Sequence, residues 1–144
     1  MNRDELIKLY KKYDLNENDV FKHAHYTIIS RGGIEKIQSK MNIEIKYEII
    51  EIHQTFAVIK ATGFIRSTPE IKIETFGSAL YGHKEKVDKG DGTFKWMDTG
   101  TCTTLYIAEM AEKRAMSRVV LKLTGLYAEG FFGEDEAESF KKKS

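Results

Sequence analysis

MAEKRAMSRVVLKLTGLY, residues 110–127, has the pattern of a long helix with two apolar strips instead of one. At about 100° per residue, Arg114, Arg118 and Lys122 form a slanted row of cations along one side of this helix. A surface helix usually carries its charges opposite a single apolar stripe. Here the row lies between two strips, the first made of Ala108, Ala111, Ala115, Val119 and Leu123 and the second of Ile107, Met110 and Leu121. We therefore expect the helix to be packed on two sides.

Upstream of this helix, the apolar pattern has the period of β-strands. Residues 43–49 alternate Ile or Tyr with Glu or Lys, which is typical of a half-buried strand, and the pair Ile49-Ile50 predicts a bulge. Residues 56–66 and 71–81 continue as an antiparallel meander. The second strand has one face of aromatic rings and cations, and one small, aliphatic face that suits a closely packed helix; the small face is Ala57, Ile59, Ala61, Gly63 and Ile65.

The remaining segments complete an α+β layout. Short amphipathic helices are predicted over residues 2–13 and 33–41, and a small hairpin excursion over residues 82–100 turns at Lys89-Gly90-Asp91-Gly92. The long helix is expected over residues 103–124 and ends at Gly125. We predict a curved antiparallel three-stranded sheet packed on one long helix, a single domain over residues 1–132, and a flexible tail, acidic and then basic, over residues 133–144.

The composition favours a soluble protein of a reducing compartment. Hydrophobic residues make up 41% of the chain and charged residues 31%, and Cys102 is the only cysteine. The first residues lack the apolar core of a signal peptide, and no run approaches the roughly 18 apolar residues of a membrane span. We therefore expect a cytoplasmic protein with no membrane partner. The net charge of only +1 is weak support for a polyanionic partner.

Motifs for catalysis and metal binding are weak. His23 and His25 lack a third ligand placed by the sequence, residues 88–92 depart from the calcium-loop pattern, and no nucleophile triad or glycine-rich phosphate loop occurs. Glu44-Ile-Lys46 has the Glu-x-Lys spacing of metal-dependent nucleases, in which a carboxylate holds a divalent ion and a lysine steadies the attacking water. Alternating charges on a strand also produce that spacing. We expect no catalytic residues, no metal and no cofactor.

The order of elements and the long helix together resemble a known family. Three antiparallel strands followed by EMAEKRAMSRVVLKLTGLY, after a strand that ends in GSALYG, resemble the DNA single-strand annealing proteins of the Rad-fifty-two superfamily, in the small phage-encoded form often called Sak. The resemblance covers residues 43–127, and FKHAHYTIISRGGIEKIQSKMNIEIKYEII is similar to the upstream part of phage members.

The resemblance implies a β-β-β-α core that assembles into rings or filaments and holds single-stranded DNA in a positively charged groove. Arg118 and Lys122 match the basic positions before the glycine that ends the helix, and Arg114 extends their row. Lys60 and Arg66 are second contributors from the strands. The excursion from Lys84 to Lys95, with its four lysines, is expected to line the groove.

The predicted function is therefore ATP-independent annealing of complementary single strands in phage-type recombination and repair, by a homo-oligomer inside a bacterial host. A single-strand binding protein is a further candidate partner, contacted by the acidic tail. Two alternatives stay open: a divalent-metal nuclease that uses Glu44 and Lys46, and an oligomeric adaptor with no affinity for DNA.

Overall fold

The sheet predicted from residues 43–81 is present in the computed structural model, which describes residues 3–23 and 25–136, and the α+β class is confirmed. The helices are α1 (Arg3–Tyr13), α2 (Arg31–Lys40) and α3 (Ile107–Leu123). The strands are β1 (Val20–His23), β2 (Tyr26–Ile29), β3 (Ile43–Ile52), β4 (Phe56–Ile65), β5 (Ile73–Leu80), β6 (Lys84–Asp88), β7 (Phe94–Asp98) and β8 (Phe131–Gly133).

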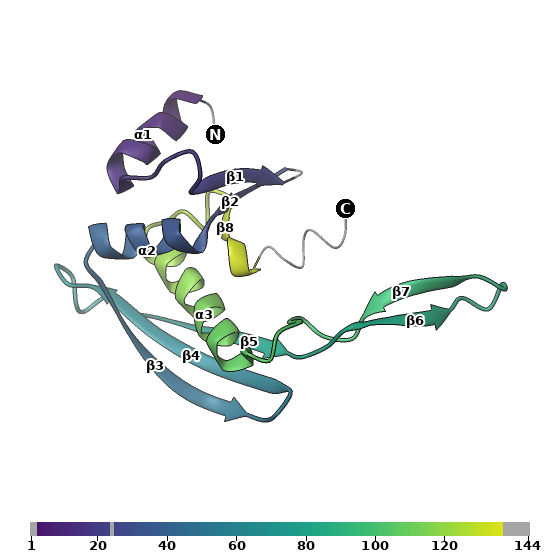
Figure 1. Ribbon diagram of the computed structural model, residues 1–144. Helices are drawn as coiled ribbons and strands as arrows, with labels where there is room; N and C mark the ends of the chain where they lie inside the picture. The colour runs from purple at the N-terminus through teal and green to yellow at the C-terminus, as the bar shows by residue number, and fades with distance from the viewer. Residues whose placement is uncertain (1–2, 24, 137–144) are drawn as a thin grey trace.

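The main layer is the antiparallel sheet β3-β4-β5, with α3 packed across one of its faces (Figure 1). The expected bulge is confirmed, because the register of β3 on β4 shifts between Ile49 and Glu51. Gly125 has a φ of 76°, the left-handed conformation that ends a helix most readily at glycine. Helix α3 begins at Ile107, four residues later than predicted.

Small residues let α3 lie close to the sheet, as the pattern of β4 predicted. Ala57, Ala61 and Ala79 are fully buried against α3, and a Cβ added to Gly77 would collide with the backbone of Ala111 and Ala115. The Thr75 hydroxyl donates a hydrogen bond of 2.8 Å to the Ala115 carbonyl. This contact satisfies a buried hydroxyl and ties the strand to the helix.

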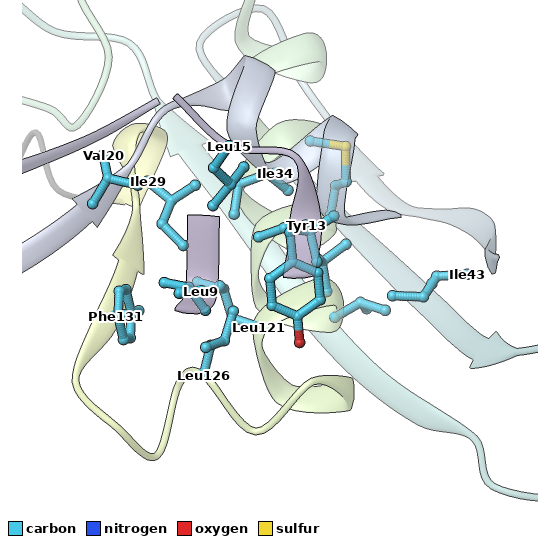
Figure 2. Packing of buried hydrophobic residues seen from close by; sticks show 14 of the residues in the cluster. Leu9, Tyr13, Leu15, Val20, Ile29, Ile34, Ile43, Leu121, Leu126 and Phe131 are labelled. Carbon is cyan, nitrogen blue, oxygen red and sulfur yellow. The ribbon is translucent and has the colours of Figure 1, made fainter. Parts of the chain in front are cut away.

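The second apolar strip of α3 is divided between two clusters of the same chain. Leu121 is fully buried in a cluster that brings together α1, α2, α3 and the segment after α3 (Figure 2). Ile107 packs instead with Cys102 in a smaller cluster on β4 and β5. At Leu121, the N-terminal helices of the same chain therefore cover the strip. A neighbouring subunit is not needed at this face.

A second small sheet was not predicted. Strand β2 pairs antiparallel with β1 and parallel with β8, so residues 27 and 131 lie side by side although they are far apart in sequence. The Ser30 hydroxyl then caps α2 by accepting a hydrogen bond from the Gly33 amide. Together these contacts join residues 20–33 to residues 131–133.

The chain stays packed against the domain beyond Gly133, where the flexible tail was expected to begin. Gly133 and Asp135 are buried, and Gly133 lies against Ser117 of α3. The rest of the expected tail, residues 137–144, lies outside the described residues. Within the described part of the chain, no helix is both long enough and apolar enough to cross a membrane.

Candidate nucleic-acid interface

The arginines of the cationic row close the free edge of β5. The Arg114 guanidinium donates hydrogen bonds to the carbonyls of Ser78 (2.7 Å), Thr101 (2.7 Å) and Asp135 (3.1 Å). Arg118 donates to the carbonyl of Phe76. Four helical residues rise about 6 Å, and two residues of an antiparallel strand span about 6.8 Å. Arginines four residues apart on α3 therefore match carbonyls two residues apart on β5.

This geometry separates the three cations of the row. Arg114 is only 7% exposed, and its donors are largely occupied by backbone carbonyls, so it is not a surface cation. Arg118 is half-buried, and Lys122 is exposed, with its ammonium 6.0 Å from the centre of the Tyr127 ring. The cationic row expected on the surface of α3 therefore lacks Arg114, because a buried guanidinium must satisfy its hydrogen bonds inside the protein.

The two strand cations lie apart from α3 and beside carboxylates. Lys60 is on the face of the sheet that α3 does not cover, 3.2 Å from Glu74 and 3.9 Å from Glu48. Arg66 follows β4 and pairs with Glu44 at 2.7 Å. Both cations are accessible, but their charges are largely balanced by these neighbours. The structure therefore does not gather the five predicted contact residues into one patch.

The acidic residues after β8 also pair with cations. Asp135 binds Arg31 at 2.7 Å, and Glu136 binds Arg118 at 3.1 Å. The hydrogen bond to Asp135 raises the pKa of the Arg31 guanidinium, although burial opposes it. Burial raises the pKa of the Glu136 carboxyl, although the nearby Arg118 charge opposes this rise. These residues hold the chain beyond β8 against α2 and α3.

Glu44 and Lys46 line a surface pocket of about 560 Å³, together with Phe64 and Lys72. The Glu44 carboxylate already pairs with Arg66, which does not line this pocket. Among residues 3–23 and 25–136, no group of three or more His, Cys, Asp or Glu side chains is arranged to hold a metal ion. The arrangement gives the nuclease alternative no observation in its favour.

The hairpin of β6 and β7 forms an arm that projects away from the sheet (Figure 1). Its register places Lys86 opposite Trp96 and Asp88 opposite Phe94. Because side chains of a strand alternate between faces, Phe94 and Trp96 share one face with Lys84 and Lys86, and also with Asp88 and Asp98. Trp96 is 67% exposed and Phe94 is 54% exposed. Large aromatic rings of this exposure, next to lysines, are a candidate surface for unpaired bases.

Local contacts shape this arm. The Lys86 ammonium lies 4.2 Å from the centre of the Phe94 ring, a cation–π geometry. At the tip, Gly90 and Gly92 have φ values of 82° and 88°, which favour glycine, and Asp88 accepts a hydrogen bond from the Gly90 amide. The tip is therefore a defined turn that keeps the two strands in register.

The aromatic pair of the arm is the feature that sequence reasoning missed. The lysines of this excursion were predicted to line a groove, whereas Phe94 and Trp96 were not singled out. Their signal is the alternation in Phe94-Lys95-Trp96, which places two rings on the same face of a strand directly after a glycine-rich turn.

Comparisons of the chain with protein families, with curated proteins and with solved structures give no match.

Proposed function

We propose that this protein binds single-stranded DNA and anneals complementary strands, without ATP and without a covalent step, as a homo-oligomer in phage-type recombination. The observation that carries the proposal is the face of the hairpin arm on which Phe94 and Trp96 stand exposed beside Lys84 and Lys86. The resemblance of residues 43–127 to single-strand annealing proteins supports the same function. A cytoplasmic setting is part of the proposal, in keeping with the single, buried Cys102.

The chemistry of this face favours a single strand over a duplex. Unpaired bases expose their flat faces to aromatic side chains, whereas the bases of a duplex are stacked on one another. Lysines on the same face reach the phosphates that flank a stacked base. The arm of Lys84–Asp98 projects from the body, so a strand laid on it keeps its base-pairing edges accessible to a complementary strand.

The remaining residues predicted to contact DNA differ in how accessible their charges are. Lys122 is exposed and is a proposed phosphate contact. Arg118 is half-buried beside it on α3 and is a proposed contact only through the part of its guanidinium that the Phe76 carbonyl and Glu136 leave unoccupied. Lys60 and Arg66 are proposed secondary contacts that must first part from their carboxylate neighbours. For Arg114 we propose no contact with DNA, because its guanidinium already binds backbone carbonyls in the interior.

Trp96 is the only tryptophan of the chain, so its fluorescence reports directly on the proposed site. We expect oligo-dT to quench this fluorescence, because a stacked base contacts the indole ring. Phe94→Ala should weaken the affinity about fivefold or more, since stacking contributes about 1–3 kcal/mol per base. Anisotropy of a labelled oligo-dT, titrated at about 50 and about 200 mM salt, should show weaker binding at the higher salt.

The matched control for this experiment is Met97→Ala, which removes an exposed side chain from the opposite face of the same hairpin. It should leave both quenching and affinity unchanged. Absence of quenching and of binding at low salt by the folded wild-type protein would refute the proposal and leave the adaptor.

Annealing is tested separately, with two labelled complementary strands in the presence of a chelator and the absence of ATP. We expect the wild-type protein to accelerate duplex formation and Phe94→Ala to lose that acceleration. Cleavage of the strands after addition of Mg²⁺, abolished by Glu44→Ala, would instead establish the nuclease.

A further inference from the structure

The two edges of the main sheet differ. The edge of β5 is closed by Arg114 and Arg118 of α3. Strand β3 forms the other edge and, among the described residues, pairs only with β4. A ten-residue strand with an open backbone edge is a template for pairing with another strand. The open edge of β3 can therefore pair with a strand of another molecule.

Apolar side chains gather along the open part of β3. Ile49 is 65% exposed, and Tyr47, Ile50 and Ile52 are also exposed. Tyr47 and Ile49 stand opposite Ala61 and Ile59, so they lie on the face that packs on α3, beyond the part of the sheet that the helix covers. A row of large apolar residues on an uncovered edge strand marks an interaction surface.

We infer that β3 pairs antiparallel with β3 of a second copy of this chain, about a two-fold axis at Tyr47, to form one continuous six-stranded sheet. This inference names one surface of the self-association within the proposed function; its two-fold contact joins two copies and does not by itself build the ring or filament that the resemblance implies. It does not depend on DNA binding by the hairpin arm.

The register follows from the side chains of β3. Directly opposite residues on paired strands lie on the same face of a sheet, so a two-fold axis must pass through a residue and not between two. An axis at Tyr47 places Lys46 opposite Glu48 of the partner chain, twice, and Ile45 opposite Ile49 of the partner chain. Opposite charges and apolar residues in such cross-strand pairs stabilise a sheet.

Other axes fit the strand less well. An axis at Lys46 places Lys46 opposite its own copy and Glu44 opposite Glu48, which are like charges. An axis at Ile45 places Glu44 opposite Lys46, but Arg66 binds the Glu44 carboxylate at 2.7 Å, more closely than the 3.9 Å from Lys60 to Glu48. It also uses the end of β3 where the Gln38 side chain reaches the Ile43 carbonyl. It would also leave Ile49 outside the pairing. An axis at Glu48 places that carboxylate opposite its own copy, and the bulge after Ile49 interrupts the strand beyond it.

The Tyr47 hydroxyls that meet at the axis are neutral. Partial burial of this side chain, which is still 38% exposed, and the negative charges of Glu112 and Glu35 nearby raise the pKa of Tyr47 to about 12. Two facing tyrosines therefore bring no charge repulsion at physiological pH.

Charge exchange on β3 tests the interface by sedimentation velocity. Lys46→Glu and Glu48→Lys should each shift the protein toward monomer, because each places like charges opposite one another. The double variant Lys46→Glu/Glu48→Lys, and an equimolar mixture of the two single variants, should restore the assembly of the wild type. Lys11→Glu makes the same charge change on the exposed side of α1 and should have no effect.

Disulfide cross-linking of cysteine variants determines the register of β3 on β3 of the second copy. Directly opposite residues have Cα atoms about 4.5–5.5 Å apart, within the range of a disulfide. Tyr47→Cys should form a covalent dimer on mild oxidation, whereas Ile45→Cys and Lys46→Cys should not. A covalent dimer from either of those two variants, but not from Tyr47→Cys, would overturn the Tyr47 axis.

The outcomes separate this inference from the proposed function. A wild-type chain that is monomeric at every concentration overturns both the interface and self-association. An oligomer that is unchanged by Lys46→Glu and not cross-linked at residue 47 overturns the β3 interface alone. Quenching of Trp96 by oligo-dT is measured in the same variants, so DNA binding is judged independently.

Discussion

Gly77 marks the closest approach between α3 and the sheet. A Cβ at this position would collide with the Ala111 carbonyl and the Ala115 amide, which are backbone atoms and cannot rotate away. The same approach brings Thr75 within hydrogen-bonding distance of Ala115 and lets the arginines of α3 reach β5. One missing side chain thus sets the helix-to-sheet distance on which the capped edge of β5 depends.

We therefore expect Gly77→Ala to lower the free energy of unfolding by about 3 kcal/mol, at the upper end of the usual effect of overpacking. Urea denaturation followed by circular dichroism measures this change. The neighbouring variant Ser78→Ala adds no volume and lies on an exposed position, so it should change stability by less than about 0.5 kcal/mol. Equal stability of the two variants would show that α3 lies further from β5.

At the level of secondary-structure elements, the sequence predicted the strands and the helix whose residue periodicity lies within a single segment. The alternation in β3 and β4 and the helical spacing in α3 each lie within one segment, and these elements are confirmed. Strands β1, β2 and β8 are three or four residues long, too short for a periodic signal. Their sheet depends on a parallel pairing between residues 27–29 and 131–133, which no local pattern shows.

Asp19 joins the loop after α1 to α2 and offers a test at this scale. Its carboxylate accepts hydrogen bonds from the Lys36 ammonium (2.6 Å) and the Asn16 amide (2.9 Å). Burial raises the pKa of this carboxyl, but these donors together outweigh burial, so the pKa is lowered from its ordinary value of 3.8. Asp19→Asn should lower stability at pH 7 by about 1–3 kcal/mol, because it weakens hydrogen bonds to a charged group.

The loss of stability in Asp19→Asn should depend on pH, with a sign that follows from the lowered pKa of Asp19. Because the pKa is lower in the folded protein, the ionised carboxylate stabilises the fold fully above about pH 4, and this stabilisation is lost as the pH falls through the folded pKa. The difference between wild type and Asp19→Asn should therefore shrink in urea unfolding below pH 4. Asp14→Asn breaks the exposed pair with Lys40 and should show neither the loss nor the pH dependence.

At the scale of the whole molecule, the chain divides into a packed body and a projecting arm. Glycines 82 and 100 lie against each other at the base of the arm, and the Thr99 amide donates a hydrogen bond to the His83 carbonyl there. The sequence revealed the hairpin and its lysines but not the arm's aromatic face. It also did not show that Arg114 is buried, because the side of α3 that meets the edge of β5 is set by packing across the whole fold.

This division predicts that the arm is dispensable for folding. Replacing Lys84–Asp98 with Asn-Gly leaves the His83–Thr99 pair closed by a two-residue turn that suits a hairpin. The melting temperature should stay within a few degrees of the wild type in differential scanning calorimetry, while binding of labelled oligo-dT is lost. Retained binding would move the DNA site to α3, and a large loss of stability would show that the arm is part of the core.

The closed edge of β5 limits how far sheets of this protein can grow. A chain with two open edges can add copies without end, which is the geometry of fibrils. With Arg114 and Arg118 on the β5 carbonyls, only the β3 edge of the main sheet accepts another strand among the described residues, so addition to this sheet stops after a single copy. The two arginines thereby protect a β-rich chain with exposed isoleucines from aggregation.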